Sequence, residues 1–155
     1  MPTIAEKLAS LGLALPTPSV PVASYVPYTI AGNLVFISGQ LPLENGQVKY
    51  TGKLGTDIDL ATGQQAAKLC ALNILAHISA ACGGAIDKVE RCVKLGGFVA
   101  CTPDFSDQPQ VINGASELMQ QVFGAAGQHA RFAVGANVLP RNASVEVEAI
   151  FLLRG

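Results

Sequence analysis

The segment HARFAVGANVLPRNASVEVEAIFLLRG, residues 129–155, predicts two β-strands joined by a turn at LPRN. The first strand contains Arg131, and the second contains Glu146 and Glu148 among apolar and β-branched residues. Because side chains alternate along a strand, the two glutamates share one face and their apolar neighbours take the other. Charged side chains inside such apolar strands need partners, so these three residues are candidates for a functional site.

Helical patterns occur in three places upstream of this segment. Apolar residues follow helical spacing in residues 3–12, in residues 59–82, and between Asp107 and Gly124. The pattern in residues 59–82 is apolar far around the helix, which predicts burial on more than one side. A proline-rich stretch after the first helix predicts an extended connector rather than a linker between domains.

Strand patterns fill the remaining parts of the chain. The pairs Gly32-Asn33 and Asn45-Gly46 accept positive φ and predict tight turns between strands. The stretch KVERCVKLGGFVAC, residues 88–101, alternates as a strand, and Gly96-Gly97 in its middle predicts a bulge or a close backbone approach. The expected inward face of this strand consists of Val89, Val93, Leu95, Val99 and Cys101.

This order of elements predicts an α+β fold of two layers. Helices separated by single strands require crossover connections, which are right-handed and place both helices on one face of a mixed β-sheet. The length of 155 residues suits one domain, residues 1–155, with a helical extension at about residues 1–20.

The composition predicts self-association and argues against nucleic acid as a partner. Apolar residues make up 50% of the chain and charged residues only 14%, whereas about 25% charge is usual for a soluble domain. A small domain cannot bury so much apolar surface alone, so we expect a symmetric homo-oligomer. The net charge is −1 and the ten basic residues are scattered, which is not the footprint of a DNA- or RNA-binding surface.

Metal, disulfide and membrane sites are not predicted. The four cysteines lack metal-ligand spacing and only two histidines are present, so we expect free, buried thiols in a reducing compartment. The uncharged run from Leu69 to Ile86 is broken by polar residues and is interpreted as a core helix. The start MPTIAEKL lacks the features of a signal peptide, so we expect a cytoplasmic protein without membrane attachment.

Arg131 and Glu146 are the strongest candidates for chemistry. A guanidinium on a strand is held rigidly and can grip a carboxylate through two parallel hydrogen bonds, although it could instead pair with a nearby acid or reach the surface. One glutamate could orient a water molecule while the other pairs with an arginine or faces solvent. His129 is near Arg131, but a polar residue at a strand entrance is an equally open interpretation. Motifs of nucleotide-binding loops, serine hydrolases and zinc proteases are absent from the sequence.

Three motifs in order, LVFISGQLP, INGA and ARFAVG-x₃-LP-x₄-VEVEAI, resemble the RidA/YjgF reactive-intermediate deaminase family, also labelled L-PSP. The resemblance covers about residues 20–153, and the closing motif is its most specific part. It implies a chorismate-mutase-like fold assembled as a homotrimer, with clefts between subunits. It also implies a hydrolase that converts enamines and imines to 2-keto acids and ammonia without a metal or organic cofactor.

The resemblance also implies roles for individual residues. Arg131 matches the arginine that binds the substrate carboxylate, and Glu146 matches the acid associated with the attacking water. The substrate-binding positions that it implies are Tyr25, Ser38, Gly39, Asn113 and Ala133. Phe132 departs from the family, where a small polar residue is common, and alternation places it on the sheet face opposite to Arg131. The alternative function is a non-catalytic protein that binds a small carboxylate as a sensor or chaperone-like module.

Overall fold

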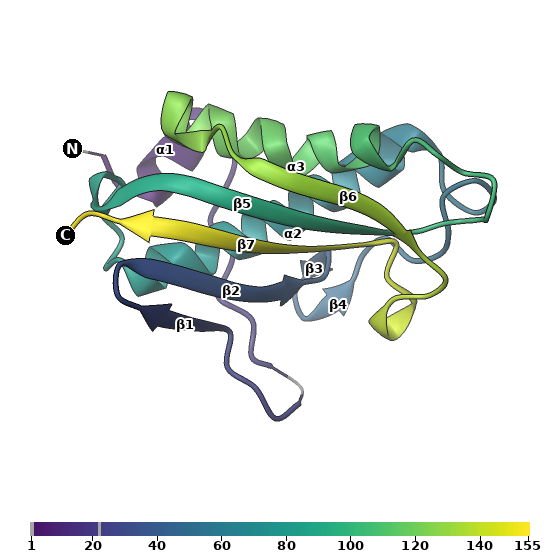
Figure 1. Cartoon of the computed structure of the whole chain (residues 1–155), viewed down its shortest axis with the longest axis horizontal. Coiled ribbons are helices and arrows are strands. Elements are labelled where there is room, and N and C mark those ends of the chain that lie inside the picture. Colours follow the sequence, from purple (N-terminus) through teal and green to yellow (C-terminus); the bar gives the residue numbers. More distant parts are fainter. Residues whose placement is uncertain (1, 22) are drawn as a thin grey trace.

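One mixed β-sheet forms the first layer of the molecule and two long helices form the second (Figure 1). The computed structural model describes residues 2–21 and 23–155. The sheet has the strand order β1-β2-β7-β5-β6, in which β5 and β6 are parallel and the other neighbours are antiparallel. Its strands are β1 (Tyr28–Ala31), β2 (Leu34–Gln40), β5 (Val89–Ala100), β6 (Ala130–Ala136) and β7 (Val145–Leu153).

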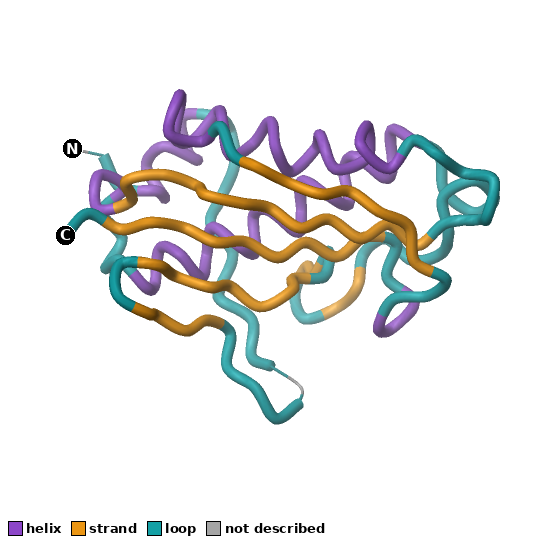
Figure 2. Tube along the Cα trace, viewed as in Figure 1, coloured by secondary structure: helices purple, strands orange, loops and turns teal. Residues whose placement is uncertain are grey.

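The helices α2 (Leu60–Ala81) and α3 (Gln108–Phe123) pack side by side on one face of the sheet (Figure 2). This confirms the predicted two-layer α+β architecture with a mixed sheet. The helix α2 lies against β2, β7 and α3, so it is buried on more than one side as its sequence predicts. Three short 3₁₀ helices connect the elements: Ile86–Lys88, Gly124–Gly127 and Pro140–Asn142.

The predicted N-terminal helix is α1 (Ile4–Ser10). It begins with a capping box, in which the Thr3 hydroxyl accepts from the Glu6 amide at 3.0 Å and the Glu6 carboxylate accepts from the Thr3 amide at 2.7 Å. Ile4 and Leu8 are fully buried, which docks the helix onto the core. Leu11 caps the C-terminal end of the helix and is 37% exposed.

Both predicted hairpin turns are present. Gly32 has a φ of 61° between β1 and β2, and Asn45 and Gly46 have φ values of 54° and 76° between the short strands β3 (Leu43–Glu44) and β4 (Gln47–Val48). Positive φ at two successive turn residues is the geometry that suits the right-handed twist of strands. The hairpin β3–β4 forms its own two-stranded sheet beside α2.

The strand β5 differs from its prediction in the position of its irregularities. Register with β7 shifts twice before Lys94, so Cys92 rather than Val93 faces the core. Gly96 and Gly97 are paired regularly with both neighbouring strands and contain no bulge. The alternative prediction was a close backbone approach, but it is side chains that approach these glycines: a Cβ on Gly96 would lie 2.6 Å from the Phe132 ring.

A close approach between α2 and α3 sets the spacing of the helix layer. A Cβ on Gly114 would collide with the backbone carbonyl of Gln64 on α2. Nearby, the Gln64 amide donates to the Gln110 carbonyl at 2.9 Å. Because backbone cannot rotate away as a side chain does, only glycine fits at this crossing.

Gly114→Ala is therefore expected to destabilise the protein by about 2–3 kcal/mol, although glycine to alanine inside a helix is usually favourable. Chemical denaturation measures the free energy of unfolding. Gln121→Ala, at an exposed position of the same helix, is the control and should change it by less than about 0.5 kcal/mol. A Gly114→Ala protein as stable as the control would contradict the proposed crossing.

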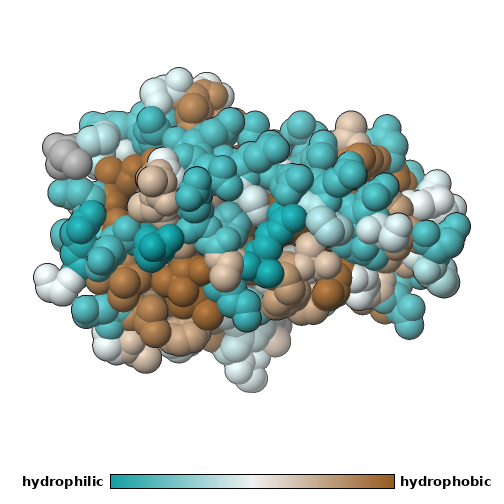
Figure 3. Space-filling view, turned by 45° about the horizontal axis from the view of Figure 1, so that its top comes forward, coloured by the Kyte–Doolittle hydropathy of each residue, from teal (hydrophilic) through white to brown (hydrophobic). Residues whose placement is uncertain are grey.

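The second face of the sheet is not covered by any element within residues 2–21 and 23–155. It carries apolar side chains, among them Phe36 and Val134, which are 40% and 43% exposed. Phe98 and Phe132 stack edge to face there with ring centroids 5.2 Å apart, so Phe132 lies on the face opposite to Arg131 as predicted. Figure 3 shows hydrophobic surface interrupted by hydrophilic patches on this side of the molecule.

Four free cysteines lie in the interior, as predicted from their sequence positions. Burial raises the pKa of the Cys92 thiol to about 12 and raises that of Cys70 well above the usual value. These groups are therefore neutral, apolar components of the core.

Candidate functional site

A cavity of about 720 Å³ lies between the C-terminal end of β2, the N-terminal end of β7 and the N-terminal connector. Its size is within the usual range for small-molecule sites. Three of the predicted site residues, Tyr25, Gly39 and Glu146, line it. The other walls come from the proline-rich connector, the β3–β4 hairpin, α2 and the turn before β7.

Glu146 projects from β7 onto the open face of the sheet, opposite Phe98 of β5. A Cβ on Gly39 would collide with its carboxylate, so the glycine of the SGQ sequence makes room for the acid. Burial raises the pKa of the Glu146 carboxyl, and the negative charge of Glu148 raises it further. A carboxyl group with a raised pKa beside a cavity is a candidate for proton transfer.

Ser38 and Gln40 fix the chain around the cavity. The Ser38 hydroxyl donates to the Val26 carbonyl at 2.7 Å, which holds the segment that carries Tyr25. Gln40 is buried, and its amide donates to the Ser38 carbonyl at 2.9 Å. Ser38 therefore serves the geometry of the site through its backbone contacts, and the half-exposed Tyr25 ring is left facing the cavity.

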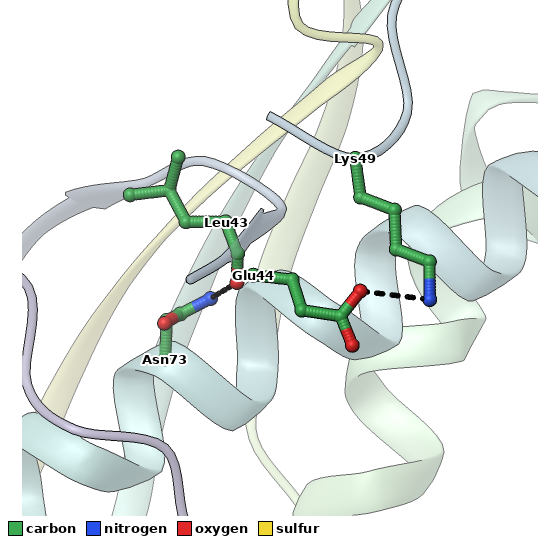
Figure 4. A network of polar contacts seen from close by, with 4 residues as sticks. All are labelled: Leu43, Glu44, Lys49 and Asn73. Atoms are coloured by element: carbon green, nitrogen blue, oxygen red, sulfur yellow. Dashed lines mark hydrogen bonds and ion pairs between the residues drawn. The ribbon is translucent and has the colours of Figure 1, made fainter. Parts of the chain in front are cut away.

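Asn73 of α2 holds the hairpin wall in place. Its side-chain amide donates to the Leu43 carbonyl and to the Leu69 carbonyl, each at 3.0 Å. Figure 4 shows the Asn73 amide pointing at the Leu43 backbone, with the Glu44–Lys49 ion pair next to it. These hydrogen bonds from a buried side chain attach the hairpin to α2 and fix the position of this cavity wall.

Arg131 lies in a second cluster, on the edge strand β6. Its guanidinium donates to the Asn113 side chain at 2.9 Å, the Ser116 hydroxyl at 3.0 Å and the Pro109 carbonyl at 3.0 Å. These partners all belong to α3, and they hold the guanidinium instead of leaving it in bulk solvent. Ala133 follows on the same face of the strand, partly buried against the core.

His129 extends this cluster by one further hydrogen bond. Its Nδ1 lies 2.6 Å from the Gly127 carbonyl, and its Nε2 lies 2.8 Å from the Ser116 hydroxyl. A carbonyl can only accept, so we assign the proton to Nδ1, and Nε2 then accepts from Ser116. The Ser116 oxygen is left free to accept from Arg131, so a neutral His129 completes a directed chain of bonds.

Low pH is expected to destabilise the folded chain through its two histidines. Burial lowers the pKa of His129, with a further decrease from Arg131, and burial also lowers that of His77. The folded state then disfavours the charged form, so this stability is full above the unfolded pKa of about 6.5 and is lost as pH falls below it. The histidines should therefore lower the midpoint temperature of thermal unfolding as pH decreases from 7.5 to 5. Protonation of Glu146, whose pKa is raised by burial, acts in the opposite direction over this range, so the histidine contribution is measured by comparison with a variant.

His129→Gln is the matched variant for this experiment. From pH 7.5 to pH 5, its midpoint temperature of unfolding should decrease less than that of the parent protein, because one of the two histidines with a lowered pKa has been removed. Asp59, whose pKa is lowered from 3.8 by the hydrogen bond from Thr62, titrates below this range and does not interfere. Equal drops in the parent and the variant would contradict a neutral His129.

The two clusters are not joined within one chain. Arg131 pairs with Leu95 on the helix-covered face of the sheet, whereas Glu146 pairs with Phe98 on the open face. The residues that line the cavity do not include Arg131 or Asn113. The sequence predicts one site that contains both Arg131 and Glu146. In a single chain, the structure places these two residues on opposite faces of the sheet.

Within the described residues, no group of three His, Cys, Asp or Glu side chains is arranged to hold a metal ion. The helices found there include none that is long and apolar enough to cross a bilayer.

The comparison with family models gives a match over residues 5–152 to the model described as "YjgF/chorismate_mutase-like, putative endoribonuclease". The chain belongs to the YjgF/chorismate-mutase-like family. Protein TCP17 of Trypanosoma cruzi is 43% identical over 148 residues, which are 95% of this chain and 92% of that protein.

Two solved structures extend the YjgF-family assignment across the fold. Atu1372 from Agrobacterium tumefaciens is 51% identical, and the match covers 97% of this chain and 92% of that chain with a TM-score of 0.91. A "putative endoribonuclease" from Shewanella oneidensis MR-1 is 32% identical, with coverage of 97% and 99% and a TM-score of 0.93. Both matches cover nearly the whole chain.

Several polar residues of this YjgF-family chain were not predicted as site residues. Among them are Ser19, Gln40, Asn73, Ser116 and Arg141, which line the cavity or contact Arg131. Gln40 belongs to the SGQ motif and Arg141 to the LPRN turn, so the local sequence could have indicated both as site residues. Ser19 and Ser116 had no such local signal, because a serine in a connector or a helix is ordinary.

Proposed function

We propose that this protein is a hydrolytic deaminase that converts reactive enamines and imines to 2-keto acids and ammonia. The observation that carries the proposal is Glu146, a half-buried acid of raised pKa beside a cavity of ligand size. Arg131 supports it, because α3 holds a guanidinium in one orientation on an edge strand. A planar guanidinium is the side chain that best matches a carboxylate.

The reaction needs only positioning and proton transfer. Arg131 binds the carboxylate of the imino acid, which fixes the electrophilic C=N carbon relative to the cavity. Glu146 accepts a proton from a water molecule as the water oxygen attacks that carbon, and it returns this proton to the nitrogen, which becomes an amine. The resulting carbinolamine gives its hydroxyl proton to Glu146, which passes it to the nitrogen, and ammonia leaves as the C=O of the keto acid forms. One water is consumed for each ammonia released.

We further propose that two subunits of a homotrimer complete each site. Arg131 and Glu146 lie on opposite faces of one chain, so Arg131 of one subunit would act with Glu146 of its neighbour. The open sheet face supports this, because Phe36 and Val134 are exposed there beside other apolar side chains. An edge strand such as β6 also suits an interface, since it has unpaired backbone groups.

The second candidate function is non-catalytic binding of a small carboxylate. It is favoured by the acceptors on α3 that hold the Arg131 guanidinium in one orientation, an arrangement that would suit a ligand site as well as a catalytic one. Cleavage of RNA, the activity suggested by the description "putative endoribonuclease" of the family, is less well supported. The cavity is lined by Glu44 and Glu146 with one cation, Arg141, and a phosphate chain requires a basic surface.

Ammonia release from a freshly generated imino acid tests the proposal. An amino-acid oxidase produces the imine in the same vessel, and semicarbazide trapping of the remaining imine measures how fast the protein removes it. We expect removal well above the spontaneous rate. A protein that binds the 2-keto acid but leaves the spontaneous rate unchanged would be the non-catalytic alternative.

A further inference from the structure

The cavity beside Glu146 is larger than a short imino acid requires. Its volume of about 720 Å³ extends from Glu146 along α2 to the tip of the β3–β4 hairpin. A three-carbon imino acid would leave most of this space filled with water. The side chain of the substrate is therefore the part that the remainder of the cavity can recognise.

The walls of this space are fixed by buried polar contacts. On one side, Asn73 binds the Leu43 carbonyl and holds the hairpin against α2. On the other side, the Ser19 hydroxyl lies 3.1 Å from both the Gln40 side chain and His77 Nε2, which pins the proline-rich connector. A cavity with pinned walls keeps its shape and can discriminate between ligands.

The charged residues that line the cavity differ in whether they have an ion-pair partner. Glu44 is neutralised by Lys49, with Oε2 and Nζ 2.9 Å apart. Arg141 is the single cation among the described residues that line the cavity. One of its five N–H groups donates to the Gly46 carbonyl at 3.1 Å, and this is the one hydrogen bond of its side chain found within the described residues. The remaining donors are available to a ligand.

The turn that carries Arg141 is itself held firmly. Arg141 has a φ of 57° and Asn142 a φ of 58°, a conformation that is uncommon for a long side chain. The Asn142 amide donates to the Leu139 carbonyl at 3.1 Å, and the Gly52 amide donates to the Asn142 carbonyl at 3.0 Å. The guanidinium is thus directed to the hairpin tip by a fixed backbone.

We propose that Arg141 is a specificity-determining residue that binds a second acidic group, the side-chain carboxylate of a dicarboxylic imino acid. This inference rests on the proposed function for the identity of the reacting end, where Arg131 binds the carboxylate next to the C=N group. In the shared site of the proposed trimer, Arg131 comes from the neighbouring subunit and the far carboxylate binds Arg141. Leu69 and Leu72 are apolar residues of α2 that line the same cavity.

Binding of the keto-acid products measures this preference without any need for turnover. Calorimetric titration with 2-oxoglutarate, a dicarboxylate, is compared with 4-methyl-2-oxopentanoate, which has similar size and one carboxylate. The parent protein should bind the dicarboxylate about tenfold or more tightly. Arg141→Asn removes the charge and tolerates positive φ, so it should fold normally and lose this preference.

Turnover provides the second readout. For imines made from glutamate and leucine, Arg141→Asn should raise KM for the glutamate imine about tenfold and leave both constants for the leucine imine unchanged. Equal losses on both imines would show that Arg141 binds the carboxylate common to them, and no dicarboxylate preference in the parent would also overturn the inference. If neither imine is hydrolysed but the binding preference persists, the proposed function fails and the role of Arg141 stands.

Discussion

Replacing Arg131 by alanine is expected to lower kcat/KM for imino-acid hydrolysis about 100- to 10,000-fold. A charge-assisted hydrogen bond contributes about 1.5–3 kcal/mol, and a carboxylate gripped through two N–H groups loses both. Steady-state kinetics with several imines measures the loss. It should be similar for all of them, because every imino acid carries the carboxylate that Arg131 is proposed to bind.

The control for this variant must separate binding from folding, because Arg131 also holds α3 through Asn113, Ser116 and Pro109. Arg131→Lys keeps the charge but loses the planar fork, so it should recover only part of the activity. Thermal unfolding of both variants reports any loss of the α3 contacts. A fully active, folded Arg131→Ala protein would remove the basis of the proposed mechanism.

Mixing of subunits tests whether Arg131 and Glu146 act across an interface. When inactive Arg131→Ala and inactive Glu146→Gln chains are refolded together, some interfaces combine an intact arginine from one chain with an intact glutamate from the other. Random assembly restores about a quarter of the sites. Activity that returns on mixing supports a shared site, and activity that stays absent in mixed oligomers argues for a site within one chain.

Replacing Glu146 by glutamine is expected to lower kcat about 100- to 10,000-fold, the usual contribution of general acid–base catalysis. Binding of a 2-keto acid should remain close to that of the parent, because the amide has the same shape. Stopped assays of ammonia release at saturating imine measure kcat. The same experiment separates an enzyme from a binding protein, which would have no turnover to lose.

The same substitution is expected to raise thermal stability at neutral pH. The pKa of the Glu146 carboxyl is raised from 4.5, mainly by burial, so the folded state favours its protonated form. That contribution is present below the unfolded pKa and is lost as pH rises through the folded pKa, so the ionised group is a cost at pH 7. Glutamine removes the cost, and the difference from the parent should vanish near pH 4.

Glu90→Gln provides the matched control for both measurements. Glu90 is an exposed residue of β5 and does not line the cavity, so its replacement should change stability by less than about 0.5 kcal/mol. Its turnover should stay close to that of the parent. A Glu146→Gln protein that behaves like this control in both measurements would contradict the role assigned to Glu146.

Local patterns predicted most of the fold because the deciding information is local. Asn45-Gly46 specifies a turn through its backbone preferences, and the alternation in VEVE places both glutamates on one face. The inward face of β5 was predicted incorrectly at Val93, because two irregularities in its pairing with β7 shift the alternation. Such shifts depend on the neighbouring strand, which the sequence of β5 does not specify.

The candidate site was less predictable than the fold for the same reason. Alternation predicts that Phe132 and Arg131 oppose each other, and they do. It does not relate β6 to β7, so the separation of Arg131 from Glu146 emerges only when the sheet order is known. The contribution of His129 depends on a contact with α3 that no spacing in the sequence encodes.

The interior position of the thiols has a consequence for handling reactive compounds. A sulfhydryl attacks electrophiles only as the thiolate, and Cys92 with a pKa of about 12 holds its proton throughout the physiological range. Alkylating reagents should therefore leave Cys70 and Cys92 unmodified until the core opens. The rate at which these thiols are modified then reports global unfolding. A protein proposed to meet reactive intermediates would thus carry its softest nucleophiles where those compounds do not reach.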